Sequence, residues 1–150
     1  MHEKIKNDLK EAMRAKDELR LSVLRMLSSA IHNREIEKKT KTGNAALTEE
    51  EVIAVVRSEI KKRRDAAEGF TKGGRNDAAG KELAELKILE AYLPAELSDE
   101  EVEKAVKEVI ACMGEITTKE FGKVMGETMK RLKGQAGGDR VSNAVKRGLQ

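Results

Sequence analysis

The stretch TTKEFGKVMGETMKRLKGQAGGDRVSNAVKRGLQ, from Thr117 to Gln150, carries the clearest structural pattern in the chain. Its first half repeats apolar residues at steps of three and four, which is the period of one helical face. Lysine and arginine occupy most of the other positions, so we expect a helix with one buried side and one cationic side. The residues of the predicted buried side are Phe121, Val124, Met125, Thr128, Met129 and Leu132.

Capping signals mark both ends of this predicted helix. Thr117 followed by Glu120 has the spacing of a capping box, in which each side chain bonds the backbone of the other residue. The run from Gly134 to Gly138 supplies residues that adopt positive φ where a helix must stop. Asp139 is then placed to cap a closing helix, whose apolar stripe is Val141, Val145 and Leu149.

The glycine-rich corner between these two helices has two interpretations. Main-chain N–H groups, a helix N-terminus and the nearby cations Lys133 and Arg140 are features that bind phosphate groups. The same turn also suits a flexible connection between two packed helices, which is the more frequent use of a glycine-rich turn. The sequence pattern by itself leaves both interpretations open.

The composition indicates an all-α protein with an aliphatic core. Hydrophobic residues make up 39% of the 150 residues and charged residues 38%, but aromatic residues only 2%. A chain of this length buries enough surface to fold without disulfides or metal ions. Because the apolar residues recur with helical spacing rather than alternating, the sequence predicts helices and no strands.

Five further helices are expected before the Thr117 stretch. Two of them begin at capping boxes, Thr48 with Glu51 and Ser98 with Glu101, and the only proline, Pro94, marks the best domain boundary. We therefore expect a helical N-terminal subdomain over residues 1–97 and a small three-helix C-terminal subdomain over residues 98–150. The five expected helices cover residues 2–16, 18–39, 48–70, 77–92 and 98–113.

Charge is distributed unevenly along the chain. The net charge is only +3, but the segment from Thr117 to Gln150 holds eight basic and three acidic residues. The segment from Thr48 to Met113 is acidic, with 11 basic and 16 acidic residues. A polyanion would therefore be attracted to the ends of the chain rather than to its middle.

The basic tetrad from Lys61 to Arg64 has the composition of a nucleic-acid signal. Consecutive residues of a helix point about 100° apart, however, so the four side chains cannot all face one ligand. Each of Lys61 and Arg64 is followed four residues later by a carboxylate, from Asp65 and Glu68. We interpret the tetrad as a solvated surface of helix ion pairs.

No group of side chains in the sequence has the spacing of a catalytic site. Neither His2 nor His32 has a cysteine or carboxylate at the sequence spacing of a metal site, so we expect no metal and no other cofactor. Cys112 stands among apolar residues and is expected to be a buried thiol in a reducing compartment. Nucleotide-binding loops and serine-nucleophile motifs are absent from the sequence. We therefore predict no catalytic residues and no enzyme activity for the chain on its own.

The sequence also bears on where the protein resides. No apolar run approaches the length of a membrane span, and charged residues follow Met1 in place of a signal-peptide core. We therefore expect a cytoplasmic protein that does not enter a membrane. The sequence does not indicate the oligomeric state.

Four segments resemble, in the same order, the YqeY-like family of small bacterial proteins. The most specific motifs are G-x-V-M-G at Gly122 to Gly126 and K-G-x-A-x-G at Lys133 to Gly138. That family is similar to the C-terminal tail domain of the B subunit (GatB) of the tRNA-dependent amidotransferases, which convert misacylated Glu-tRNA(Gln) or Asp-tRNA(Asn) to the amide. The four segments are LKEAMRAKDELRLSVLRMLSSAIHNREIE, EIKKRRDAAEGFTKGGRND, ILEAYLPAELSDEE and FGKVMGETMKRLKGQAGGDRVSNAVK.

The resemblance implies an all-helical protein of two subdomains that binds tRNA or a tRNA-handling complex. It also implies that amide transfer takes place elsewhere in such a complex, even where relatives carry the label of a carbon–nitrogen ligase with glutamine as amido donor. The residues that the resemblance assigns to RNA binding are Lys123, Lys130, Lys133 and Arg140, with Gly134, Gly137 and Gly138 allowing close approach of the backbone.

Two other functions remain open from the sequence. A helical adaptor that binds another protein would use the acidic middle and the basic ends as complementary patches. A component that assists glutamine-dependent amidotransferase activity would join the complex without supplying its nucleophile. The only aromatic residues are Phe70, Tyr92 and Phe121, so RNA recognition would depend on phosphate contacts and shape rather than on base stacking.

Overall fold

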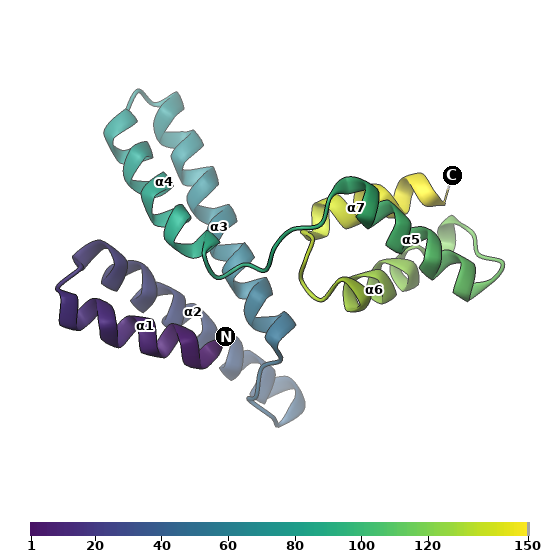
Figure 1. Ribbon diagram of the computed structural model, residues 1–150, viewed down its shortest axis with the longest axis horizontal. Coiled ribbons are helices and arrows are strands. Elements are labelled where there is room, and N and C mark those ends of the chain that lie inside the picture. The colour runs from purple at the N-terminus through teal and green to yellow at the C-terminus, as the bar shows by residue number, and fades with distance from the viewer. Residues whose placement is uncertain (150) are drawn as a thin grey trace. The chain divides into compact units, whose positions relative to one another are not determined.

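The computed structural model describes residues 1–149 and confirms the predicted all-α class. Within these residues the chain forms seven α-helices, one short 3-10 helix and no strand (Figure 1). Gln150, the last residue of the predicted C-terminal subdomain, lies outside the described residues. The elements are α1 (His2–Ala15), α2 (Glu18–Thr42), α3 (Glu49–Lys72), α4 (Asn76–Glu90), α5 (Asp99–Met113), η1 (Thr118–Glu120), α6 (Phe121–Leu132) and α7 (Gly138–Gly148).

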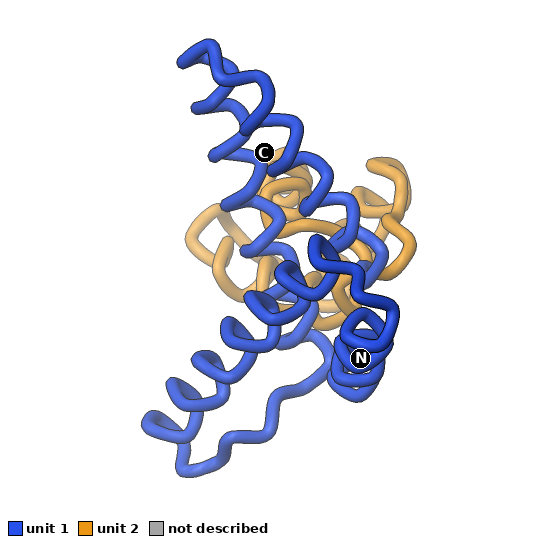
Figure 2. The backbone as a smooth tube through the Cα atoms, turned by 90° about the vertical axis from the view of Figure 1, so that its left-hand side faces the viewer, with its two compact units in different colours: residues 1–93 blue, residues 94–150 orange. Residues whose placement is uncertain are grey.

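The helices belong to two compact units, Met1–Leu93 and Pro94–Gln150 (Figure 2). The first unit contains α1 to α4, and the second contains α5, η1, α6 and α7. Each unit has its own cluster of buried apolar side chains. The predicted subdomain boundary between residues 97 and 98 stays a prediction.

Local signals place the helices of the first unit much as the sequence predicts. The side chain of Thr48 accepts a hydrogen bond from the Glu51 N–H at 3.2 Å, and the Glu51 carboxylate accepts one from the Thr48 N–H at 2.7 Å. The capping box at the start of α3 is thus confirmed. Helix α2 runs to Thr42, beyond the predicted end at residue 39, and stops at Gly43 with φ 78°.

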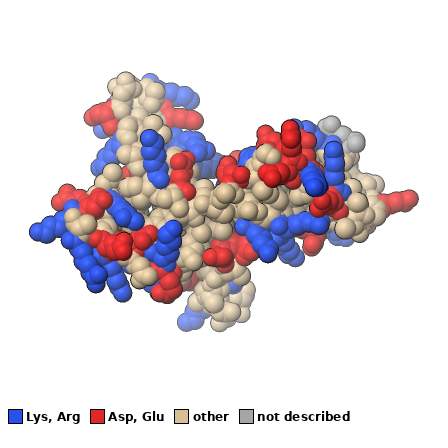
Figure 3. Space-filling view, viewed as in Figure 1, with Lys and Arg blue, Asp and Glu red and all other residues tan. Residues whose placement is uncertain are grey.

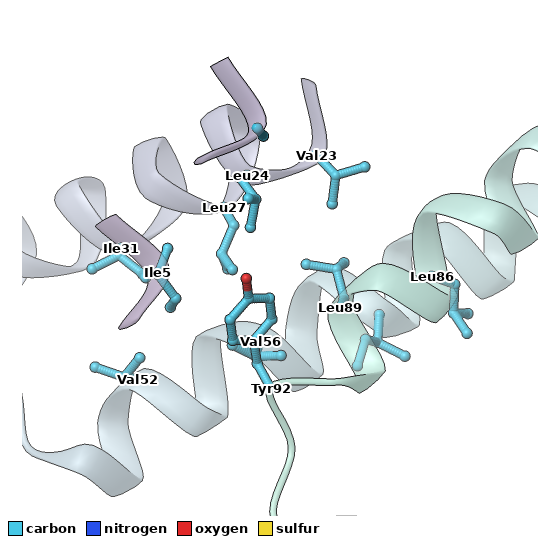
Figure 4. Close-up of a cluster of buried hydrophobic side chains, with 12 residues drawn as sticks. Ile5, Val23, Leu24, Leu27, Ile31, Val52, Val56, Leu86, Leu89 and Tyr92 are labelled. Atoms are coloured by element: carbon cyan, nitrogen blue, oxygen red, sulfur yellow. The ribbon is translucent and has the colours of Figure 1, made fainter. Parts of the chain in front are cut away.

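Aliphatic side chains fill the core of the first unit, as the composition predicts (Figure 4). The largest fully buried side chains here are Ile5, Val23, Leu24, Leu27, Ile31, Val56 and Leu89. The helical period of the sequence places Met13 and Leu83 on apolar helix faces, but both side chains are exposed, Met13 at 54% and Leu83 at 46%. Both stand at the edge of a stripe, because one neighbouring helix covers a narrower band than the sequence period suggests.

Tyr92, just beyond the end of α4, connects that end of the unit to α1. Its side chain lies within the aliphatic cluster (Figure 4). Its hydroxyl donates a hydrogen bond to Oδ2 of Asp8. The same carboxylate oxygen lies 3.6 Å from Nη2 of Arg20 on α2. Burial, followed by the hydrogen bond to Asp8, raises the pKa of Tyr92 to about 12.

Substitution of Tyr92 by phenylalanine should change how stability depends on pH. Between about pH 10 and pH 12 the folded chain keeps the phenolic proton that the unfolded chain loses, so stability falls as the pH rises. Tyr92→Phe should abolish this fall, which we expect to be about 1–2 kcal/mol. Urea unfolding of both proteins at several alkaline pH values measures the difference. Parallel pH profiles for the two proteins would contradict this role of Tyr92.

One residue of the basic tetrad, Arg63, differs from our interpretation of the tetrad as a solvated surface. Arg63 is buried, with only 4% of its surface exposed. Among the described residues, Lys62 and Arg63 are the members of the tetrad that form ion pairs with carboxylates. Arg63 Nη1 lies 3.0 Å from Oε2 of Glu59, and its Nε lies 3.4 Å from Oε2 of Glu85 on α4. Both carboxylates are themselves buried. The prediction was wrong for Arg63 because Glu85 comes from another helix, which helix spacing within α3 cannot reveal, whereas Lys61, Lys62 and Arg64 are exposed as predicted.

Removal of the Arg63 guanidinium should destabilise the first unit strongly. Arg63→Ala leaves two buried carboxylates without their shared cation, and we expect a loss of about 3 kcal/mol in the free energy of unfolding. A triple variant, Arg63→Met with Glu59→Leu and Glu85→Leu, should recover most of that loss because it removes the buried charges together. Urea unfolding compares the two variants with the parent chain. A single variant as stable as the parent would show that the cluster contributes little.

Candidate nucleic-acid interface

Helix α6 has the buried side that the sequence predicts. Val124, Thr128 and Leu132 are fully or almost fully buried, and Val124 and Leu132 belong to one cluster with apolar side chains from α5 and α7. The Thr117–Glu120 capping box forms as predicted, with the Glu120 carboxylate 2.6 Å from the Thr117 N–H. It opens the short η1, and α6 follows directly from it.

Burial of that side turns the lysines of α6 toward solvent. Lys123 and Lys130 are exposed and stand seven residues apart, which places them on the same face about 10 Å apart along the axis. Between them Glu127 lies 3.5 Å from Nζ of Lys130 and partly offsets its charge. Lys133, also exposed, ends the helix in the left-handed conformation with φ 47°.

The glycine-rich corner is a packed connection as well as a turn. Gly134 takes φ 78°, and Ala136 is 1% exposed and belongs to the core of the unit. Gly137 is the N-cap of α7 and Gly138 is its first residue, so the main-chain N–H groups of α7 begin at this corner. The structure therefore places Lys133 and the three glycines within one continuous segment.

Two expectations for this region are wrong. Asp139 does not cap α7, because the helix begins at Gly138 and puts Asp139 inside its first turn, where a carboxylate still complements the helix dipole. Cys112 is exposed rather than buried. It lies in the last turn of α5 beside a shallow hollow lined by Glu127, Lys130 and Arg131, because the buried stripe of α5 runs through other positions.

Arg140 is engaged within the second unit instead of facing solvent with the lysines. Its Nη2 donates to the carbonyl oxygen of Leu97 at 2.6 Å and to Oδ1 of Asp99 at 2.8 Å, and its Nη1 lies 3.5 Å from Oε2 of Glu96. The Leu97 N–H in turn donates to the carbonyl oxygen of Gln135 at 2.9 Å. Arg140 thus secures the segment that enters α5, a role that sequence spacing did not indicate.

The second unit as a whole is electrically balanced. Residues 94–150 hold ten basic and ten acidic residues, with the acids concentrated in α5. Ion pairs join α5 to the basic helices, with Arg131 3.2 Å from Glu108 and Arg147 3.0 Å from Glu103. Figure 3 shows both signs of charge mixed over the visible face. Among residues 1–149, Lys123 and Lys133 form no ion pair within 4.0 Å.

The described residues hold no group of three histidine, cysteine or carboxylate side chains with the geometry of a metal site. Among the same residues, no helix is both long and apolar enough to cross a bilayer. The two histidines instead lie near one carboxylate, with Nδ1 of His2 and of His32 at 3.6 Å and 3.5 Å from Glu35.

Comparison with known proteins gives a consistent family. A family model described as "Yqey-like protein" matches residues 2–149. The chain belongs to the YqeY-like family. This YqeY-like chain is 33% identical to "Altered inheritance of mitochondria protein 41, mitochondrial" of Vanderwaltozyma polyspora, over 85% of the chain and 70% of the relative. It is 38% identical to the protein of that name in Kluyveromyces lactis, over 83% of the chain and 69% of the relative.

These relatives overturn one expectation about the YqeY-like chain. A third protein of the same name, from Pyrenophora tritici-repentis, is 29% identical over 89% of the chain and 71% of the relative. All three relatives are named as mitochondrial proteins, so the cytoplasmic location expected from the sequence is wrong. The charge and hydropathy of the residues after Met1 therefore did not predict the cellular compartment of this protein.

Loss of the Arg140 side chain should loosen the segment before α5. Arg140→Ala removes the donor to the Leu97 carbonyl and to Asp99, so the neighbouring Leu97–Gln135 hydrogen bond should open more often. We expect amide hydrogen exchange at Leu97 to accelerate by about tenfold, since charge-assisted hydrogen bonds contribute roughly 1.5–3 kcal/mol. Lys146→Ala, an exposed substitution in the same helix, serves as the control. Unchanged exchange at Leu97 in Arg140→Ala would contradict this role.

Proposed function

We propose that the chain is a non-catalytic tRNA-binding accessory module, whose contact with RNA is made by the outer face of α6 and the corner that follows it. The observation that carries the proposal is the position of Lys123, Lys130 and Lys133 on one exposed edge of a helix whose other side is buried. Membership of the YqeY-like family supports the same function, given the resemblance of that family to the amidotransferase tail that was described from the sequence.

Phosphate groups are the part of an RNA that this edge suits. Lysine supplies a mobile point charge that neutralises phosphate, and the first N–H groups of α7 begin at Gly138, close to Lys133 in sequence. Aromatic side chains are not available there for base stacking, because Phe121 is partly buried against the core of the second unit. The proposed binding is therefore tolerant of sequence and strongly dependent on salt.

Arg140 takes a reduced part in this proposal. Its guanidinium already bonds Asp99 and the Leu97 carbonyl, so its contribution to RNA binding would be to hold the corner in place. Gly134, Gly137 and Gly138 would allow the sugar–phosphate backbone to approach the main chain, since none of them carries a side chain. The complex in which such a module works is proposed to be one that handles misacylated tRNA.

A triple variant, Lys123→Ala with Lys130→Ala and Lys133→Ala, tests the proposal. Fluorescence anisotropy with labelled tRNA across a salt series should show weaker binding by this variant. The dependence of log K on log salt should become shallower by about 1 for each phosphate that a lysine no longer neutralises. The three residues are exposed, so the helicity of the variant should be unchanged.

A second triple variant provides the matched control. Lys10→Ala with Lys61→Ala and Lys87→Ala removes the same charge from exposed positions of the first unit. We expect this control to bind tRNA with nearly the parent salt slope. Equal weakening of both variants would indicate unspecific attraction to net charge, and no tRNA binding by the parent chain at low salt would refute the proposal.

A helical adaptor for another protein is the second candidate. The balanced charge of residues 94–150 favours it, because a surface with ten residues of each sign does not attract polyanions over long range. Partner capture that survives nuclease treatment, together with an absence of tRNA binding, would support this candidate. Assistance to a glutamine-dependent amidotransferase is a special case, and turnover with glutamine, ATP and misacylated tRNA in the presence and absence of the chain would detect it.

A further inference from the structure

A groove of about 880 Å³ runs between α2 and α3 of the first unit. The two helices are antiparallel along it, since Lys38 of α2 lies 2.8 Å from Glu51 near the start of α3, while Met26 lies 3.5 Å from Arg63 farther along. The lining extends from Arg25 to Glu37 on α2, which is a length of about 18 Å.

Small and apolar side chains form the floor of this groove. They recur at helical spacing on both sides, so each helix presents one continuous stripe to the groove. Met26, on the α2 side, is 51% exposed, and Ala54 and Ser58 on the α3 side are also exposed. Small residues of this kind allow another helix to approach within the usual distance of about 8–10 Å. The floor residues are Met26, Ser29, Ala30, Ala54, Val55 and Ser58.

The two ends of the groove carry opposite charge. At the end next to the α2–α3 loop, the lining contains the carboxylates of Glu37, Glu50 and Glu51 with the single cation Arg34. At the far end it contains two cations, Arg25 and Lys62, with the single carboxylate of Glu59. The groove is therefore complementary to the groove of a second copy that runs in the opposite direction, because the acidic end of each then meets the basic end of the other.

We propose that this groove is the contact surface between two copies of the chain, which meet groove to groove in an antiparallel, two-fold arrangement. A two-fold axis applies every contact twice, so the basic end of each groove faces the acidic end of the other. Helix α2 lies along α2 of the second copy, and α3 along its α3, as in a four-helix bundle made of two hairpins. In this register Arg25 faces Glu37 of the second copy, and Lys62 faces its Glu50.

The floor of small residues suits a weak association. Few large apolar side chains line the groove, and several of the charged groups also have partners within one copy, such as Arg34 with Glu37 at 3.1 Å. Interfaces with little apolar area are typical of transient contacts, for which we expect a dissociation constant on the order of 10–100 µM. Salt should weaken the dimer because its specificity comes from charge.

Sedimentation equilibrium of the full chain, over concentrations that reach the millimolar range, tests the proposal. The parent chain should form dimers, and Arg25→Glu or Glu37→Arg alone should weaken them by about tenfold, because each substitution opposes like charges twice. An equimolar mixture of the two variants should recover dimers, because each substituted residue then faces a residue of opposite charge in the other copy.

Ala54→Arg should abolish association by filling the floor of the groove. Lys10→Glu, an exposed change on α1, is the charge control, and circular dichroism checks helicity.

Several results would overturn the proposal. A parent chain that stays monomeric at the highest concentration would exclude the groove as a contact between copies of the chain. The groove would then either bind a helix of another protein or have no partner. A dimer that is indifferent to Ala54→Arg would place the contact elsewhere. Variants that fail to associate when mixed would exclude the antiparallel register.

Discussion

Burial of one face of α6 is the constraint on which the candidate site depends. Val124, Thr128 and Leu132 are enclosed by α5 and α7, so rotation of α6 about its axis would expose apolar surface to water. The lysines at positions 123 and 130 are thereby held on the solvent side, and Lys133 follows where the helix ends. The cationic edge is thus a consequence of packing in the second unit.

Ion pairs within the second unit limit how much of its basic charge is available to a ligand. Arg131, Arg140 and Arg147 each pair with a carboxylate on or next to α5, whereas Lys123 and Lys130 of α6 are exposed and form no ion pair with that helix in the described residues. Arginine suits such bonds between elements because its planar guanidinium donates to more than one acceptor. The arginines of this unit therefore join its helices, and the exposed lysines of α6 are the charges to which we assign the proposed RNA contact.

Most features that arise within one helix could be predicted from the sequence, although Asp139 was wrongly expected to cap α7. Features that join distant helices could not be predicted. The capping boxes at Thr48, Ser98 and Thr117 all form, because each depends on residues three positions apart. The ion cluster of Arg63 and the hydrogen bonds of Arg140 depend on partners from other parts of the chain, which no local period encodes. For the site, the exposed face of α6 followed from its period, but the engagement of Arg140 and the exposure of Cys112 required the packing of α5.

An NMR titration of the ¹⁵N-labelled full chain with tRNA tests the central claim most directly, because it reports every amide at once. We predict that line broadening and shift changes begin in the segment from Lys123 to Gly138, and that they fade as salt is added. The amides of α3 and α4 would change little. Perturbations confined to the first unit, or no perturbation at low salt, would contradict the claim that α6 and its corner contact RNA.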